Sequence, residues 1–149
     1  MISNNLKVMF TGSITKEKSC WDSLLDGEFI MYGKPPNEER LFLYAAFDIY
    51  YYGMGKESHV RALPFCTNEE TYPIENYRLS LMQRFHGSCT LESITPNAAC
   101  AFRFKCKHFE MYQPEHKTIF QASRDVMESK FEYEVDGLIF TPMQTGVGS

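Results

Sequence analysis

The sequence predicts an α+β fold with a mainly antiparallel sheet and flanking helices. Runs of strand length, rich in aromatic and aliphatic residues, dominate the 149-residue chain. Turn signals that contain Gly or Pro join neighbouring runs in the manner of hairpins. Two segments carry the spacing of three and four residues that is typical of an amphipathic helix. Segregated strands and helices of this kind are characteristic of the α+β class.

The expected strands follow one another along most of the chain. Two prolines in the turn at 33–37 close one strand, because proline cannot continue a ladder. Gly53 and Gly55 mark a further turn. The strands are expected at residues 6–10, 23–32, 41–52, 59–63, 100–109 and 136–142.

The two expected helices are residues 76–85 and 118–129. Asn76 is a suitable N-cap for the first helix, and Gly87 ends it. Its apolar stripe repeats every four positions, at Tyr77, Leu81 and Phe85. The second helix has apolar and small side chains at Ile119, Phe120, Ser123, Val126 and Met127.

Composition narrows the class of protein. Hydrophobic residues make up 44% of the chain and aromatic residues 15%, which are globular values. A formal net charge of −4 argues against a free-standing electrostatic nucleic-acid binder. The five cysteines form no CxxC pair and the four histidines have no metal-ligand spacing, so reduced thiols and no zinc site are expected. No apolar run reaches membrane-spanning length, and a cytoplasmic protein without a membrane partner is expected.

Acidic residues next to glycine open one apolar strand and lie inside another. Asp136-Gly137 opens the strand at 136–142, and Asp26-Gly27-Glu28 lies inside the strand at 23–32. A carboxylate at the mouth of a buried strand is costly unless it meets a cation, a donor or a metal. Glycine beside the carboxylate lets a ligand or a backbone come close.

These elements, in this order, resemble the nucleotidyltransferase core of mRNA capping enzymes, most closely those of large DNA viruses. Residues 24–28 resemble the acidic strand between motifs I and III, and Phe47-Asp48 resembles motif III. Residues 102–109 resemble motif IIIa, and residues 136–140 resemble motif IV. The resemblance implies the fold of this family, a core like those of DNA ligases and ATP-grasp enzymes.

Two motifs of the family are absent from residues 1–149. No lysine is followed two residues later by Asp-Gly, so the nucleophilic lysine of motif I is missing and the chain supplies no catalytic residue. The Lys-x-Lys strand of motif V is missing as well, because the sequence stops at Ser149. We therefore expect an incomplete core, the central part of a guanylyltransferase domain, inactive by itself.

The resemblance implies four nucleotide-binding residues, and each has a plainer alternative. Glu28 is expected near the ribose; by alternation it shares a face with Asp26, although a bulge at Asp26-Gly27 with a solvated Glu28 is the alternative. Phe47 is expected to stack on guanine, unless it is a core residue beside Ala45 and Ile49.

Lys107 is expected to reach the nucleotide, unless Arg103, Lys105 and Lys107 form an ordinary solvated strand face. Asp136 is expected to bind Mg²⁺ (or Mn²⁺) and the phosphates, unless it serves only the turn. Asp48 is expected to point to the opposite face from Phe47 and to hold a neighbouring loop.

The expected function is that of an mRNA guanylyltransferase fragment with GTP and the 5′ end of RNA as partners. The resemblance also implies triphosphatase and methyltransferase modules in the same polypeptide or complex, and a virus factory or virion as the location. An ATP-dependent nucleic-acid ligase fragment is the rival enzyme. A non-catalytic binding module of the same fold is the rival outside enzymes.

Overall fold

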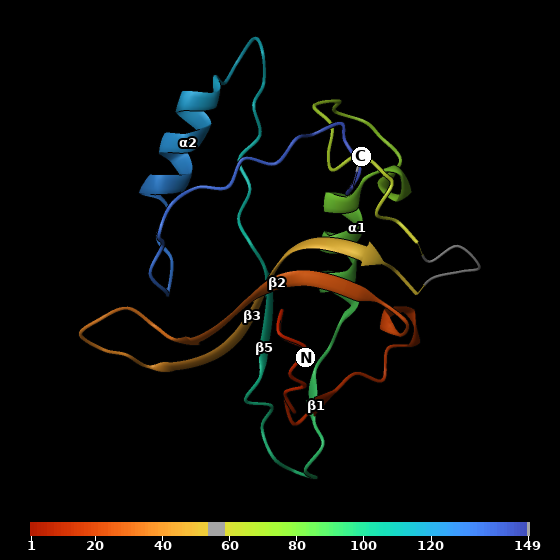
Figure 1. Cartoon of the computed structure of the whole chain (residues 1–149), viewed down its shortest axis with the longest axis vertical. Helices are drawn as coiled ribbons and strands as arrows, with labels where there is room; N and C mark the ends of the chain where they lie inside the picture. Colours follow the sequence, from red (N-terminus) through yellow and green to blue (C-terminus); the bar gives the residue numbers. More distant parts are fainter. Residues whose placement is uncertain (54–58, 149) are drawn as a thin grey trace.

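A three-stranded sheet forms the centre of the chain (Figure 1). The structure is a computed structural model that describes residues 1–53 and 59–148, so part of the turn expected at 53–55 lies outside the described residues. The strands are β2 (Leu24–Tyr32), β3 (Arg40–Tyr51) and β5 (Arg103–Cys106), in the order β2–β3–β5. β2 pairs antiparallel with β3, and β5 pairs parallel with β3.

Shorter elements complete the fold. β1 pairs antiparallel with β4 in a separate two-stranded sheet. The predicted α+β class, with mostly antiparallel pairing and two α-helices, is therefore confirmed. The remaining elements are β1 (Ser13–Ile14), the 3-10 turn η1 (Lys18–Cys20), the 3-10 turn η2 (Ile74–Asn76), α1 (Arg78–Ser88), β4 (Glu92–Ser93) and α2 (Ile119–Glu128).

A β-bulge at Asp26-Gly27 interrupts the pairing of β2 with β3. Asp26 lies opposite Asp48 and Gly27 lies opposite Ala46, so the register passes over Phe47. Gly27 is required here, because a Cβ at this position would lie 2.7 Å from the carbonyl oxygen of Ala45. The extra residue of the bulge, Phe47, lies in β3, so the bulge interrupts the alternation of β3 and leaves the alternation of β2 at Asp26 and Glu28 unaffected.

The two faces of the central sheet carry different cores. α1 covers one face, where Ala46 of β3 packs with Met82 and Phe85. Phe104 of β5 joins this core through an edge contact with the ring of Phe85, at 5.6 Å between centroids. The opposite face carries a smaller cluster made by Ile30, Leu41, Leu43 and Ala45, on which Tyr133 packs.

The helices form close to their expected positions. α1 begins at Arg78 rather than after Asn76, because residues 74–76 form a 3-10 turn and Tyr77 takes the N-cap position. It also continues through Gly87. α2 begins after Thr118, whose hydroxyl accepts from the backbone N–H of Gln121 while the Gln121 side chain accepts from the backbone of Thr118. This capping box fixes the start of α2.

Several expected strands are shorter or missing. β5 is limited to residues 103–106 of the expected 100–109. Residues 6–10 and 59–63 contribute only isolated bridges, Ile2 with Val8 and Tyr51 with His59. Residues 136–142 are described but form no strand, because no neighbouring strand pairs with their backbone. Sequence pattern predicted an extended segment, whereas a strand also needs a partner.

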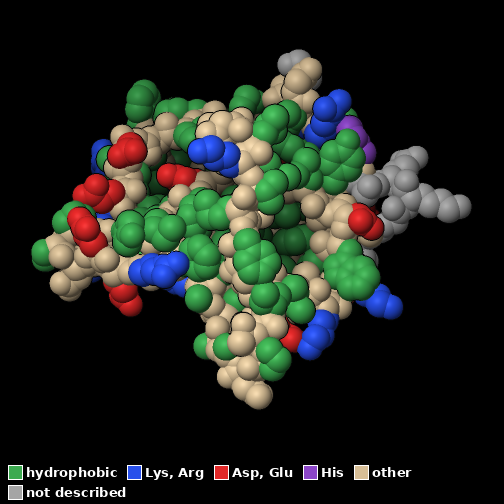
Figure 2. Space-filling view, turned by 60° about the horizontal axis from the view of Figure 1, so that its bottom comes forward, with side chains coloured by type: hydrophobic (Ala, Val, Ile, Leu, Met, Phe, Trp, Pro, Cys, Tyr) green, Lys and Arg blue, Asp and Glu red, His purple; other side chains and the backbone are tan. Residues whose placement is uncertain are grey.

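Large hydrophobic side chains are exposed on this fold. Phe10, Phe120 and Ile139 are about four-fifths exposed, at 77%, 80% and 84%. Figure 2 shows one face on which hydrophobic side chains gather, with charged side chains around them. Exposed apolar areas of this kind are typical of surfaces that bind another protein segment.

Candidate functional site

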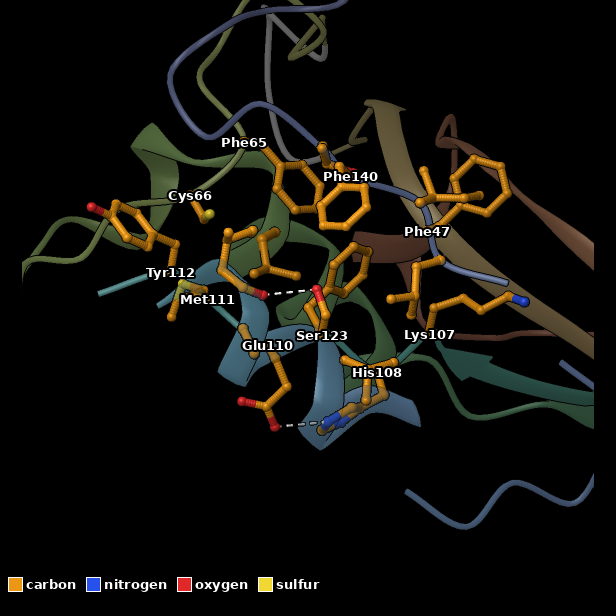
Figure 3. Close-up of a pocket in the computed structure, with 18 of the residues that line it drawn as sticks. Phe47, Phe65, Cys66, Lys107, His108, Glu110, Met111, Tyr112, Ser123 and Phe140 are labelled. Carbon is orange, nitrogen blue, oxygen red and sulfur yellow. Dashed lines mark hydrogen bonds and ion pairs between the residues drawn. The ribbon is translucent and has the colours of Figure 1, made fainter. Parts of the chain in front are cut away.

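A cavity of about 470 Å³ lies between the sheet and α2 (Figure 3). Residues 131–143 run along it and connect α2 to the C-terminal segment. Its walls are mainly apolar. The aromatic and methionine side chains that line it are Phe47, Phe65, Phe109, Met111, Tyr112, Phe131, Tyr133, Phe140 and Met143.

Three of the four predicted nucleotide-binding residues line this cavity: Glu28, Phe47 and Lys107. Glu28 comes from β2, where it pairs with Ala45 of β3. Lys107 follows β5 directly, and its backbone N–H donates to the carbonyl of Ala46 at 2.7 Å. Adjacent strands thus bring together residues that are far apart in the sequence.

Glu28 and Lys107 form an ion pair at the cavity. Lys107 Nζ lies 2.6 Å from Glu28 Oε2 and 5.1 Å from the centre of the Tyr133 ring. The Lys107 side chain is 25% exposed and that of Glu28 is 57% exposed. Glu28 is therefore neither an isolated edge residue nor a buried charge, and both groups are open to an incoming ligand.

Phe47 turns toward the cavity because of the bulge, which leaves it without a register partner in β2. It is half-buried and belongs to neither hydrophobic cluster of the described residues. Among the ring pairs of the described residues, Phe47 takes part in none, although other rings line the same cavity. Phe47 therefore lines the cavity without an aromatic partner among the described residues.

Asp48 is buried and holds a neighbouring segment through Arg78. Arg78 Nε and Nη2 donate to the two Asp48 carboxylate oxygens at 2.8 and 3.1 Å. Arg78 Nη1 donates to the carbonyl oxygens of Leu63 and Thr145. The guanidinium also lies 5.5 Å from the centre of the Phe65 ring, a cavity wall. This group of contacts, here named the Arg78 clamp, holds Phe65 in its place in the cavity wall.

The Arg78 clamp was not predicted from the sequence. One signal was available, because Arg78 is the first residue of α1. A cation at a helix N-terminus opposes the helix dipole, so an arginine at this position indicates a partner elsewhere. The 30 positions between Asp48 and Arg78 hide that partner from a local pattern.

Asp136, the predicted metal ligand, does not line the cavity, although its neighbours Val135 and Gly137 do. Its side chain is exposed. Within the described ranges it makes no ion pair, and no group of three or more His, Cys, Asp or Glu side chains is arranged to hold a metal ion. One free carboxylate still fits Mg²⁺ as it is bound in phosphoryl transfer, through one or two carboxylates and the substrate phosphates.

Arg103 and Lys105 of β5 alternate with Phe104, which packs into the core under α1, as the sequence pattern predicted. Arg103 and Lys105 both pair with Glu132, with Arg103 Nη1 and Nη2 each 2.9 Å from a carboxylate oxygen. These cations, Arg103 first, lower the pKa of Glu132 to about 2. Sequence reasoning missed Glu132, which lies in the segment that crosses the cavity.

A second charged cluster ties α2 to the chain that follows β5. Lys117 Nζ lies 2.8 Å from Glu110 Oε2 and 2.7 Å from Asp125 Oδ2. His108 Nε2 lies 2.9 Å from the other oxygen of Glu110, as the dashed line in Figure 3 shows. The Lys117 ammonium, and then His108, hold the pKa of Glu110 below its usual value. The cluster keeps α2 in place beside the cavity.

Cys66 and Cys106 have the character of inert thiols. Burial raises the pKa of Cys66, which lines the cavity, and burial raises the pKa of Cys106 to about 11. A raised pKa leaves little thiolate, which is the reactive form. Neither of these thiols is therefore a good nucleophile for the cavity.

Comparison with protein-family models, with curated proteins and with solved structures gives no match. In the described part of the chain no helix has both the length and the apolar character needed to cross a membrane.

Proposed function

We propose that the chain is the central part of a GTP:RNA guanylyltransferase domain of the mRNA-capping type found in large DNA viruses, and that the cavity is its guanine-nucleotide pocket. One observation carries this proposal. Glu28, Phe47 and Lys107, selected from sequence motifs alone, line a single cavity, although Glu28 and Lys107 are 79 positions apart.

Each of the three side chains suits one part of a guanine nucleotide. The Phe47 ring offers a face for the purine, and such stacking contributes about 1–3 kcal/mol per base. The Glu28 carboxylate accepts hydrogen bonds from ribose hydroxyls. Lys107, a point charge that tolerates varied geometry, meets phosphate or the base edge. A bound nucleotide separates the Glu28–Lys107 pair and gives each group a new partner.

The proposed reaction follows the family that the sequence resembles. A lysine outside residues 1–149 attacks the α-phosphate of GTP, pyrophosphate leaves, and a lysyl-N-GMP intermediate forms. The GMP then passes to the 5′ diphosphate end of RNA. Asp136 would hold Mg²⁺ (or Mn²⁺) together with substrate phosphates, and the ion neutralises charge on the phosphates. The residues of this chain bind and orient the nucleotide.

The wider setting is part of the same proposal. Triphosphatase and methyltransferase modules act beside this domain, in a virus factory or virion within the cytoplasm. Reading the genomic frame tests the fragment hypothesis directly, because it should continue into Lys-x-Asp-Gly upstream and Lys-x-Lys downstream. A frame that lacks both motifs would favour the non-catalytic binding module.

Photo-crosslinking with 8-azidopurine nucleotides tests the function on the chain itself. We expect 8-azido-GTP to label a peptide that contains Phe47 or Lys107, and excess GTP, but not excess ATP, to prevent the labelling. Preference for 8-azido-ATP would favour the ligase. Saturable labelling by neither nucleotide would reject the nucleotide pocket and leave the binding module.

Radiolabelled GTP provides the accompanying chemical test. Incubated with α-labelled GTP and Mg²⁺, the chain should form no covalent GMP adduct, because Lys-x-Asp-Gly is absent from it. An acid-labile GMP adduct on one of its own lysines would contradict the proposal that the nucleophile lies outside these residues.

A further inference from the structure

Three cations follow one another along one side of β5 and its continuation. Arg103, Lys105 and Lys107, here named the cationic row, are spaced at every second residue, about 6.6 Å apart along a strand. Their side chains are 37%, 49% and 25% exposed. The spacing is comparable to that between successive phosphates of an extended single-stranded nucleic acid.

Carboxylates from two other elements cover the cationic row. Both carboxylate oxygens of Glu132 accept hydrogen bonds from Arg103, and Glu132 also forms an ion pair with Lys105. Glu28 forms an ion pair with Lys107, at the end of the cationic row that lies in the cavity. Glu39 adds a further negative charge near Arg103, so carboxylates largely neutralise the cationic row in the free chain, whose formal net charge is −4.

The contact between Glu132 and Arg103 has the geometry with which arginine binds phosphate. Two N–H donors of one guanidinium face two oxygens of one anion, both at 2.9 Å, and this fork matches carboxylate and phosphate equally well. Glu132 reaches the row because the backbone N–H of Lys34 donates to its carbonyl at 3.1 Å. The carboxylate thus stands where a phosphate group would bind.

We propose that the cationic row binds the backbone phosphates of the RNA acceptor strand, and that Glu132 is an internal competitor which RNA displaces. This inference rests on the proposed function, because the row ends at Lys107 in the cavity where GMP would be held. RNA lying along the row brings its 5′ end to that cavity.

The energies favour exchange. The Glu132 side chain is 39% exposed, so water screens its pairing with Arg103 and Lys105. An RNA strand replaces Glu132 with several phosphates and releases condensed counterions. Displacement therefore costs little and frees Arg103 and Lys105 for the ligand.

Fluorescence anisotropy with a labelled single-stranded RNA oligonucleotide, titrated at several salt concentrations, tests the proposal. The double variant Arg103→Gln/Lys105→Gln should bind more weakly, with a salt dependence whose slope is smaller by about 1.4, which is about 0.7 for each lost contact. Glu132→Gln should bind about two- to fivefold more tightly, in proportion to a surface ion pair.

Glu92→Gln is the matched control, since it removes the same charge from an exposed pair, Lys16–Glu92, in the β1–β4 sheet. It should leave the affinity for RNA close to that of the wild type. Equal tightening by Glu132→Gln and Glu92→Gln, or an unchanged salt slope in the double variant, would overturn the proposal. Circular dichroism and urea unfolding show that each variant is folded.

The two proposals fail separately. Phe47→Ala should lose crosslinking to 8-azido-GTP and keep its affinity for RNA, because Phe47 lies off the cationic row. Intact GTP crosslinking without any effect of the row variants on RNA binding would refute the RNA site alone. RNA binding along the row without GTP crosslinking would refute the nucleotide pocket alone.

Discussion

Removing one partner of the buried Arg78–Asp48 pair should destabilise the chain strongly. The Arg78 side chain is 3% exposed and the Asp48 side chain 11% exposed. Arg78→Met leaves the Asp48 carboxylate buried without its cation, and a change of this kind costs about 3–5 kcal/mol. Two backbone carbonyls, of Leu63 and Thr145, lose their donor in the same variant.

This loss is large relative to the whole stability of a domain, which is about 5–15 kcal/mol. Urea unfolding measures it, followed by the fluorescence of the single tryptophan, Trp21. With a slope of about 2 kcal/mol per molar urea, a loss of about 4 kcal/mol lowers the midpoint by about 2 M.

The double variant Arg78→Met/Asp48→Leu separates the pair from general packing. Replacing both partners by apolar residues leaves no stranded charge, so the double variant should be at least about 2 kcal/mol more stable than Arg78→Met alone. Glu92→Gln at the exposed Lys16–Glu92 pair is the control and should cost less than about 1 kcal/mol. A loss below about 1 kcal/mol in Arg78→Met, or additive losses in the double variant, would refute the reasoning.

Three further predictions concern the bulge, the Glu132 contact and α2. Gly27→Ala should lower the free energy of unfolding by about 1–3 kcal/mol through overpacking. Gly87→Ala, with no atom within 4 Å of the added Cβ, should raise it by about 0.5–1 kcal/mol. A urea midpoint that is higher for Gly27→Ala than for Gly87→Ala would contradict the close approach at the bulge. The folded-state pKa of Glu132 lies below its ordinary value of 4.5, at about 2, so its stabilisation is present above pH 4.5 and is lost as the pH falls toward 2. The urea midpoints of wild type and Glu132→Gln should therefore differ at neutral pH and converge in acid, and a constant difference would exclude the ion pair. Thr118→Ala should cost about 0.5–2 kcal/mol by removing the cap of α2, and an unchanged unfolding midpoint would show that the capping box does not stabilise the helix.

Local patterns predicted the parts of the fold that local physics decides. Alternation at 103–107 placed the cations on one side and Phe104 and Cys106 on the other, because strand side chains alternate strictly. Thr118 and Gln121 fix the start of α2 because their side chains form the capping box with nearby backbone groups. Glu28 and Phe47 line one cavity because β2 and β3 are neighbours in the sheet, and their role as nucleotide-binding residues stays a prediction.

Local sequence patterns could not predict the contacts between segments that are distant in the chain. The sequence around 136–142 has strand character, yet a ladder depends on a neighbour that no local window contains. The pairing of Glu132 with Arg103, 29 positions away, follows from the path of the segment across the sheet. The first helix starts at Arg78 because residues 74–76 form a 3-10 turn, and the pairing of Arg78 with Asp48, 30 positions away, lies outside any local window.

Calorimetric titration of the chain with GTP, compared with Phe47→Ala, tests the central claim most directly. The account predicts saturable binding of GTP that weakens by about 5- to 150-fold in Phe47→Ala, the equivalent of about 1–3 kcal/mol of stacking. Phe120→Ala, which removes an 80% exposed ring from α2 outside the cavity lining, is the matched control and should bind GTP like the wild type. GTP binding that is absent, or that is equally strong in Phe47→Ala and the wild type, would contradict a guanine-nucleotide pocket at this site.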